Sequence, residues 1–144
     1  MPAAPPAVPQ RMRGGRTDIR NETDIVRARQ AGRDLARELG FGTADQTRLA
    51  TAISELARNI IHYAGEGWCV VTEVSAADTV GIRVVVEDEG PGIADLSKAM
   101  TMGYTTGKGL GAGLPGAKRL VHTFEIESQP GHTRIVLGIS RRRA

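Results

Sequence analysis

Glu55 and Asn59 are the first residues in the sequence whose types and spacing suggest chemistry. They stand four positions apart in Glu-Leu-Ala-Arg-Asn, so a helix would place one above the other on the same face. A carboxylate and a carboxamide arranged in this way offer oxygen ligands of the kind that hydrated Mg²⁺ accepts, and the carboxylate could act as a base toward a hydroxyl group or water. An ordinary solvated helix face has the same spacing, so the pair alone does not define a site.

Asp88 is a second candidate, because it ends an apolar run and is followed by the glycine-rich turn Gly90-Pro-Gly92. A carboxylate at the end of a strand can accept a hydrogen bond from an exocyclic amine, while glycine backbone lies flat against the ring that carries the amine. A plain turn after a strand would also contain these residues. Asp88, Gly90 and Gly92 therefore gain their meaning from the other candidates.

The segment 107–113 is the third candidate, a glycine-rich loop that leads directly into a predicted helix. Its exposed N–H groups and the positive end of the helix dipole suit phosphate groups. Better-known phosphate loops do not fit: no apolar strand directly precedes the G-x-G-x-x-G match at 111–116, and no Ser or Thr follows Lys108 as in a P-loop. The V-A-I-K, H-R-D and D-F-G motifs of eukaryotic-type kinases are also absent. We expect Lys108 itself to be solvated.

The elements that must position these candidates begin with two helices. Apolar spacing predicts a helix over 24–39 with Thr23 as its N-cap. A capping-box pattern, Thr-Ala-Asp-Gln, predicts a second helix over about 43–64, whose separate polar face carries Glu55 and Asn59. The other predicted elements are an edge strand at 17–20, strands at 68–74 and 80–87, helices near 95–102 and at 114–122, and strands at 123–128 and 133–139. This order indicates an α+β fold, a two-layer sandwich of a mixed or antiparallel sheet with helices on one face.

The composition excludes several classes of function. The net charge is +3, but six of the nineteen basic residues are arginines near the two ends, so 17–140 carries a net charge of −3 and offers no folded basic surface for nucleic acid. The single cysteine, Cys69, fits a reducing compartment, and no apolar run approaches the roughly 20 residues of a membrane span. We expect one cytoplasmic domain over 16–140, with a disordered leader at 1–15 and a basic tail at 141–144.

The three candidates occur in an order that resembles the GHKL (Bergerat-fold) ATP-binding family, over about residues 17–140. The N box of that family, E-x-x-x-N, matches Glu55 and Asn59. Its first glycine box, D-x-G-x-G, matches Asp88, Gly90 and Gly92, and its second glycine box matches Gly109, Gly111 and Gly113. A threonine late in the family's domain contacts the adenine pocket, and Thr133 is the candidate for it.

Within this family the chain is similar to the short serine/threonine kinases of partner-switching systems, notably in EDEGPGI and GLGAGLPGAKRLV. The resemblance implies a kinase that uses ATP and Mg²⁺ to phosphorylate STAS-domain antagonist or scaffold proteins, and that then binds a PP2C-type phosphatase. It implies that Glu55 is the catalytic base and that Asn59 holds the metal. The implied ATP-binding residues are Asn59, Asp88, Gly90, Gly92, Gly109, Leu110, Gly111, Ala112, Gly113 and Thr133.

Two other functions remain open on the sequence alone. The chain could be an anti-sigma factor that holds a sigma factor directly, or a regulatory binder in which ATP sets the conformation without phosphoryl transfer. A sigma factor is therefore a further candidate partner, whereas neither nucleic acid nor a membrane is expected. A histidine-kinase interpretation of His62 does not fit, because no second helical domain is present to offer a phosphoacceptor.

Overall fold

A computed structural model describes residues 14–95, 99–100 and 113–143 of the chain. The predicted leader up to residue 13 and most of the predicted helix near 95–102 lie outside the described residues. So do Gly109, Leu110, Gly111 and Ala112 of the second glycine box. No helix in the described part is both long and apolar enough to cross a membrane.

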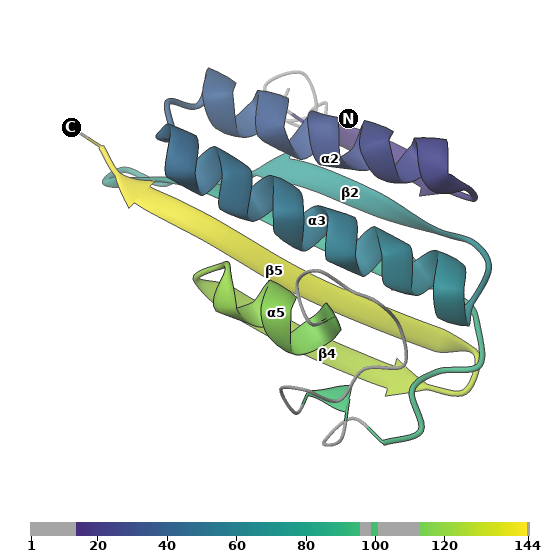
Figure 1. Cartoon of the computed structure of the whole chain (residues 1–144). Coiled ribbons are helices and arrows are strands. Elements are labelled where there is room, and N and C mark those ends of the chain that lie inside the picture. The colour runs from purple at the N-terminus through teal and green to yellow at the C-terminus, as the bar shows by residue number, and fades with distance from the viewer. Residues whose placement is uncertain (1–13, 96–98, 101–112, 144) are drawn as a thin grey trace, which may run out of the picture.

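The strands form one five-stranded sheet in the order β1-β2-β3-β5-β4, and every neighbouring pair is antiparallel (Figure 1). Along β3 and β5 the buried positions alternate with more exposed ones, as expected when one face of a sheet packs on a core. The strands are β1 (Gly14–Ile19), β2 (Gly67–Glu73), β3 (Thr79–Asp88), β4 (Thr123–Gln129) and β5 (His132–Arg142). The predicted α+β sandwich is confirmed, with the antiparallel form of the sheet.

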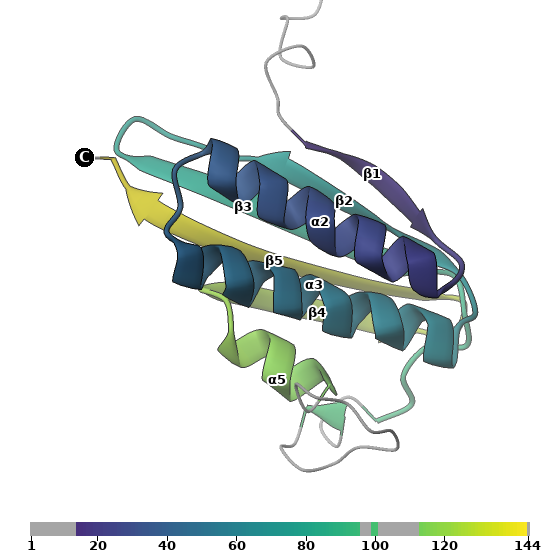
Figure 2. The same ribbon diagram turned by 45° about the horizontal axis from the view of Figure 1, so that its top comes forward.

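The three helices that the structure describes cover one face of this sheet, with α5 lying beside α3 (Figures 1 and 2). They are α2 (Glu22–Glu38), α3 (Thr43–Tyr63) and α5 (Gly113–Arg119). Where α2 crosses α3, a Cβ on Gly32 would collide with the end of the Ile53 side chain, so the absent side chain lets the two helices approach closely. The helix that carries both N-box residues is thus held firmly over the middle of the sheet.

Both predicted helix caps were wrong. Helix α2 starts earlier than expected, at Glu22, and its N-cap is Asn21, whose side-chain oxygen accepts the N–H of Asp24 at 3.1 Å. Helix α3 has Gly42 as its N-cap, so Thr43 already lies inside the helix and cannot form a capping box. Gln46 instead donates from Nε2 to the carbonyl oxygen of Phe41 at 2.9 Å, which ties the start of α3 to the preceding turn.

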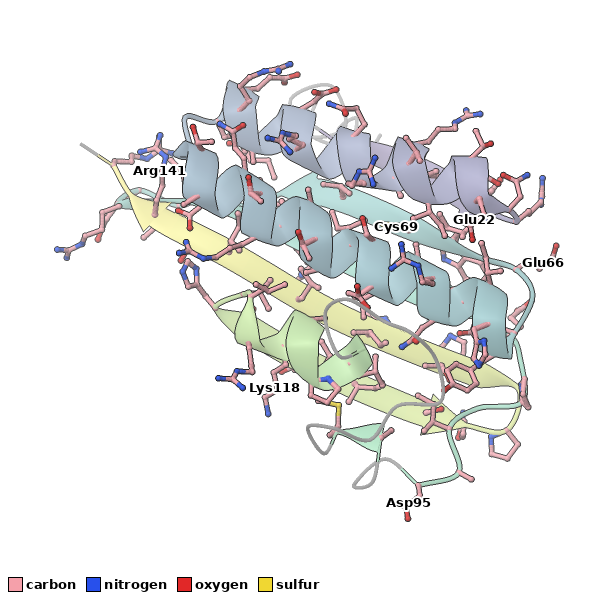
Figure 3. All side chains as sticks on the ribbon, viewed as in Figure 1. Glu22, Glu66, Cys69, Asp95, Lys118 and Arg141 are labelled. Atoms are coloured by element: carbon pink, nitrogen blue, oxygen red, sulfur yellow. The ribbon has the colours of Figure 1, made fainter. Side chains whose placement is uncertain are left out.

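The sheet extends further at both ends than the sequence indicated. Strand β1 begins at Gly14, and β5 runs to Arg142, so the first residues of the expected basic tail belong to the sheet. Arg141 donates from Nη2 and Nε to the carbonyl oxygen of Leu39, at 2.8 and 3.1 Å, and its guanidinium lies 5.8 Å from the centre of the Phe41 ring. Figure 3 shows Arg141 at the turn between α2 and α3, where it satisfies a carbonyl group at the end of α2.

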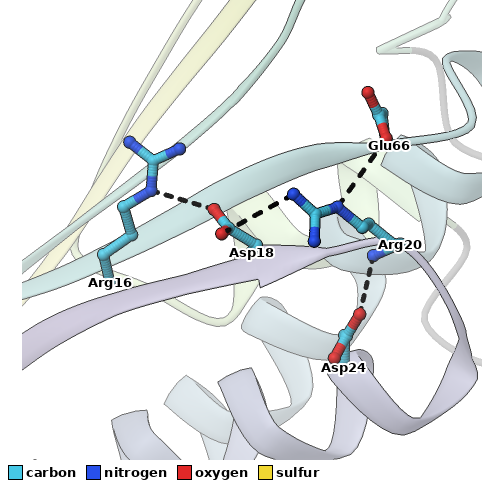
Figure 4. Close-up of polar contacts among 5 residues, drawn as sticks. All are labelled: Arg16, Asp18, Arg20, Asp24 and Glu66. Atoms are coloured by element: carbon cyan, nitrogen blue, oxygen red, sulfur yellow. Dashed lines mark hydrogen bonds and ion pairs between the residues drawn. The ribbon is translucent and has the colours of Figure 1, made fainter.

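A surface network connects the turn after β1 with the turn before β2 (Figure 4). Asp18 accepts from Arg16 at 2.9 Å and lies 4.0 Å from Arg20, whose Nε is 3.8 Å from Glu66. The backbone N–H of Arg20 donates to Asp24 in the first turn of α2 at 2.9 Å. These side chains are exposed, so each ion pair contributes about 0–1 kcal/mol, and the network mainly fixes the direction in which the chain enters α2.

Candidate functional site

A pocket lies between α3 and the sheet, where β3 ends and β5 begins. The space between its atoms, counting the open mouth, is about 390 Å³. Its walls are mainly apolar, with a few polar groups among them. The lining residues are Leu56, Asn59, Ile60, Tyr63, Val86, Asp88, Pro91, Gly92, Ile93, Thr133 and Ile135.

Asp88 and Thr133 form the polar floor of this pocket. They are direct partners across β3 and β5, so their side chains point to the same face of the sheet although 45 residues separate them in sequence. Both are buried, with 9% and 4% of their surfaces exposed. Beside them on β2, Gly67 pairs with Asp88, and any Cβ on Gly67 would press on Ile60 and on the Asp88 side chain. Gly67 does not line the pocket, but its lack of a side chain leaves room for Asp88, a role that the sequence analysis missed.

The Asp88 carboxylate has one oxygen engaged and one available. Its Oδ1 accepts the N–H of Gly90 at 2.9 Å, a turn-type bond that fixes the orientation of the carboxylate. Within the described part of the chain, no protein donor reaches Oδ2. A buried carboxylate with a free acceptor atom on the wall of a pocket suits a ligand that brings its own N–H donor.

The loop after Asp88 is clamped between the end of α3 and the β4–β5 hairpin. A Cβ on Gly90 would lie 2.5 Å from the Cβ of Ala64, and a Cβ on Gly92 would lie 2.5 Å from the carbonyl oxygen of Gln129. Gly92 also has φ +85°, which side-chain-bearing residues rarely adopt. Packing against the protein itself thus already favours glycine at both positions.

Hydrogen bonds complete this clamp. The N–H of Gly131 donates to the carbonyl oxygen of Gly90 at 2.9 Å, and the N–H of Ile93 donates to Ser128 Oγ at 2.8 Å. Ser128 Oγ in turn lies 2.6 Å from Thr133 Oγ1. The sequence analysis also missed Ser128. Exposed and half-buried residues alternate strictly along β4, and Ser128 occupies a half-buried position of the kind that Phe124 and Ile126 occupy. A serine in such a position could have indicated a buried hydrogen bond.

Helix α3 supplies one side of the pocket through Asn59 and Tyr63, which lie one turn apart. Tyr63 is 49% exposed, and the His62 ring packs edge-on against it at 4.5 Å between ring centres. A half-exposed aromatic ring at a pocket mouth offers a flat apolar surface to a ligand. Sequence analysis did not select Tyr63, because its spacing from Asn59 continues an ordinary helical pattern.

Glu55, which the sequence analysis placed on a polar helix face, is buried in the structure. It is only 4% exposed and does not line the pocket, although it is one helical turn from Asn59. Arg58 approaches it with Nη1 3.3 Å from Glu55 Oε2, while the Arg58 side chain itself is 44% exposed. A buried carboxylate is costly without a nearby positive charge, and Arg58 provides one.

The second glycine box is represented in the described residues by Gly113 alone, the first residue of α5. Gly113 has φ +67° and open space where a Cβ would be. The N box, the first glycine box and the candidate threonine all contribute residues to one pocket, with Gly90 in the loop beside it. The residues that line it are Asn59, Asp88, Gly92 and Thr133. Among the described residues no group of three or more His, Cys, Asp or Glu side chains could hold a metal ion.

Residues 44–143 match the family model described as "Histidine kinase-, DNA gyrase B-, and HSP90-like ATPase". The chain is 54% identical over 113 residues to serine/threonine-protein kinase RsbT of Bacillus subtilis (strain 168), covering 78% of this chain and 85% of that protein.

Solved structures share the fold at lower identity. The RsbU and RsbW domains of Rv1364c from Mycobacterium tuberculosis match with a TM-score of 0.60 and 23% identity, over 88% of this chain and 33% of that one. This chain therefore spans about a third of the Mycobacterium tuberculosis chain. The catalytic domain of histidine kinase ThkA matches with a TM-score of 0.53 and 19% identity, over 86% and 94% of the two chains. The resemblance predicted from the N box and glycine boxes is confirmed, and the chain belongs to the GHKL family of histidine kinase-, DNA gyrase B- and HSP90-like ATPases.

Proposed function

We propose that this chain is a serine/threonine protein kinase that transfers the γ-phosphoryl group of ATP to a hydroxyl side chain of a STAS-domain protein, within a partner-switching system that relays stress signals. The observation that carries this proposal is the 54% identity to a serine/threonine-protein kinase over most of both chains. Membership of an ATPase family supports ATP as the nucleotide. The pocket formed by α3, β3 and β5 is the site that we propose for it.

The side chains that line the pocket suit the adenine base. Leu56, Ile60, Ile93 and Ile135 form apolar walls, which suit a flat ring, while the free oxygen of Asp88 can accept a hydrogen bond from an exocyclic amine. Thr133 adds a hydroxyl group beside the carboxylate. We call Asp88, Thr133 and Ser128 the base end of the site.

Asn59 is the residue that we propose to hold Mg²⁺. It lines the pocket from α3, and its carboxamide oxygen is a ligand type that Mg²⁺ accepts. A single protein ligand fits a Mg²⁺ ion held largely by phosphates and water, and the absence of an acidic cluster in the described residues is compatible with that arrangement. The ion, when bound, neutralises charge on the phosphate groups.

Glu55 and Arg58 form what we call the transfer end. On α3 the pocket-lining residues run from Leu56 to Tyr63, so Glu55 lies just beyond the pocket, one turn before Asn59 and away from the base end. That position suits a carboxylate that orients or deprotonates the hydroxyl group of a protein substrate rather than one that binds the base. Phosphoryl transfer depends mostly on positioning, so the bond from Arg58 serves to hold this carboxylate in place.

The second glycine box completes the proposed ATP site. Its backbone N–H groups over 109–113 would bind the γ-phosphate, so we predict that this segment is better protected with ATP than with ADP. Hydrogen exchange followed over 103–113 in the two nucleotides measures this directly. Equal protection would remove the γ-phosphate contact from the proposal.

The proposed partners are those that the resemblance to the kinases of partner-switching systems implies. A STAS-domain antagonist or scaffold protein is the substrate, and a PP2C-type phosphatase is the target once the kinase is released. We place the protein in the cytoplasm, where ATP and such partners are found, and assign the kinase domain to residues 16–140. The free, buried Cys69 is compatible with a reducing compartment.

Transfer of labelled γ-phosphate tests this function. The full chain is incubated with labelled Mg-ATP and the STAS-domain proteins encoded near its gene, in parallel with Glu55→Gln and with the exposed control Glu66→Gln. Label should appear on a STAS protein with wild type and with the control, and should be absent with Glu55→Gln. Absence of label despite measured ATP binding would overturn the kinase proposal in favour of a nucleotide-gated binder, and a pull-down with sigma factors would then test the anti-sigma alternative.

A further inference from the structure

Arg58 is an exposed positive charge beside the buried carboxylate of the transfer end. Its Nη1 lies 3.3 Å from Glu55 Oε2, and its side chain is 44% exposed whereas that of Glu55 is 4% exposed. A guanidinium group carries several N–H donors in a planar fork. Among the described residues Glu55 is the only partner of Arg58, so most of these donors remain open to solvent.

Helix geometry directs these open donors away from the pocket. The residues of α3 that line the pocket form one stripe along the helix, namely Leu56, Asn59, Ile60 and Tyr63. At about 100° per residue, Arg58 points about 150° away from the centre of this stripe. A nucleotide in the pocket therefore lies on the opposite side of α3 from the open donors of Arg58.

Glu55 lies between the side of α3 that faces the pocket and the side that carries Arg58. Viewed along the helix, it is about 40° from Asn59 and about 60° from Arg58, in opposite directions. The phosphate groups, with Mg²⁺ on Asn59, would thus reach Glu55 from one side. A protein substrate has to bring its hydroxyl group from the side that the nucleotide leaves open, and Arg58 is the positive charge on that side.

A carboxylate on the substrate fits the open donors of Arg58, because the planar fork of a guanidinium matches the two oxygens of a carboxylate. Without Arg58, such a carboxylate would be repelled by Glu55 and by the phosphate groups of ATP. Since the same guanidinium contacts Glu55, it holds the substrate carboxylate close to the hydroxyl group that Glu55 receives.

We propose that Arg58 is a specificity-determining residue, which pairs with an acidic side chain that flanks the acceptor serine or threonine of the protein substrate. The inference rests on the proposed kinase function and adds the chemical class of the segment that is phosphorylated. It gives Arg58 a contact with the substrate in addition to its contact with Glu55.

The two contacts of Arg58 affect different kinetic quantities. Loss of the contact with Glu55 slows transfer within the complex and lowers kcat. Loss of a contact with the substrate raises the KM for the protein partner. Neither loss should change the dissociation constant for ATP by more than about twofold, because Arg58 does not line the pocket.

Kinetics of label transfer from Mg-ATP to the STAS-domain protein that the wild type phosphorylates test the proposal. Arg58→Ala should raise the KM for that partner by about 10–100-fold, and Arg58→Lys, which keeps the charge but not the fork, should raise it less. Arg37→Ala is the matched control and should behave as the wild type, since Arg37 pairs with Asp34 at 3.2 Å with the same spacing on α2. Thermal unfolding of each variant confirms that it is folded.

A double-mutant cycle across the interface distinguishes the substrate contact from a purely internal role. The acidic residues that flank the mapped acceptor are changed one at a time to the corresponding amides. One of these changes should raise the KM with wild-type kinase by a similar factor and should raise it no further with Arg58→Ala.

Three results would overturn the inference and leave Arg58 as a residue that only holds Glu55. They are an unchanged KM in Arg58→Ala, effects of Arg58→Ala and of every acid-to-amide change that add independently, and an acceptor with no acidic residue beside it. A wild type that labels no STAS-domain protein would instead overturn the proposed function itself.

Discussion

The base end of the site lies on three neighbouring strands, whereas the transfer end lies on a single helix. At the base end Asp88, Thr133 and Ser128 take their positions from strand register and from bonds to the backbone of the adjoining loop. At the transfer end Glu55 and Arg58 are three residues apart on α3 and are positioned by helix geometry. Substitutions at the base end should therefore weaken nucleotide binding, whereas substitutions at the transfer end should slow phosphoryl transfer.

The largest expected effect is at the transfer end. Glu55→Gln should reduce phosphoryl transfer by about 10²–10⁴-fold, the usual contribution of a general base, while the dissociation constant for ATP stays within about twofold. Single-turnover transfer and equilibrium ATP titration measure the two quantities on the same sample. A large loss of ATP affinity in this variant would mean that Glu55 belongs to the nucleotide-binding site instead.

At the base end, Asp88→Asn is the matched change. It keeps the shape of the side chain but replaces a charged acceptor by an amide, and it should weaken ATP binding by about 10–100-fold. Asp45→Asn, at an exposed ion pair in the first turn of α3, serves as the control and should bind ATP as the wild type does. An Asp88→Asn variant with normal affinity and slow transfer would reverse the assignment of the two ends.

Alanine substitutions at Gly92 and Gly65 test whether the loop at the base end depends on close contact with the β4–β5 hairpin. Gly92 and Gly65 both have positive φ, at +85° and +87°, but a Cβ on Gly92 would lie 2.5 Å from the carbonyl oxygen of Gln129, whereas Gly65 has open space. Gly65→Ala should lower the free energy of unfolding by about 1 kcal/mol through backbone strain alone. Gly92→Ala should cost more and should weaken ATP binding as well. Equal losses in denaturant unfolding would mean that the loop does not depend on close contact with the hairpin.

The smallest effect is expected at Cys69, which lies on β2 and is buried under the helix layer (Figure 3). Burial raises the pKa of its thiol from 9.0 to about 12, so alkylating reagents should not modify it in the folded protein at pH 8. In the unfolded chain the thiol ionises near pH 9, so the free energy of unfolding should fall as pH rises from about 9 toward about 12. Mass spectrometry measures the alkylation. Rapid modification of the folded protein would show that β2 readily separates from the core and exposes Cys69.

The sequence predicted the elements and the family better than it predicted the contacts. The order of helices and strands followed from periodicity, and Asn59, Asp88 and Thr133 followed from motifs. The burial of Glu55 did not follow, because a polar residue on a helix looks solvated until its surroundings in the fold are known. Ser128 and Gly67 were missed for a related reason: their roles arise from pairing with Thr133 and Asp88 across strands, and register is a tertiary property.

The proposed kinase activity requires that this chain phosphorylates a hydroxyl group on a STAS-domain protein. Mass spectrometry of that partner after incubation with the chain and Mg-ATP, with half of the sample treated with acid, tests it most directly. We predict one added phosphate that survives acid and maps to a serine or threonine, as expected of a phosphate ester. An unmodified partner, or a phosphate that acid removes and that maps to a histidine, would contradict the account.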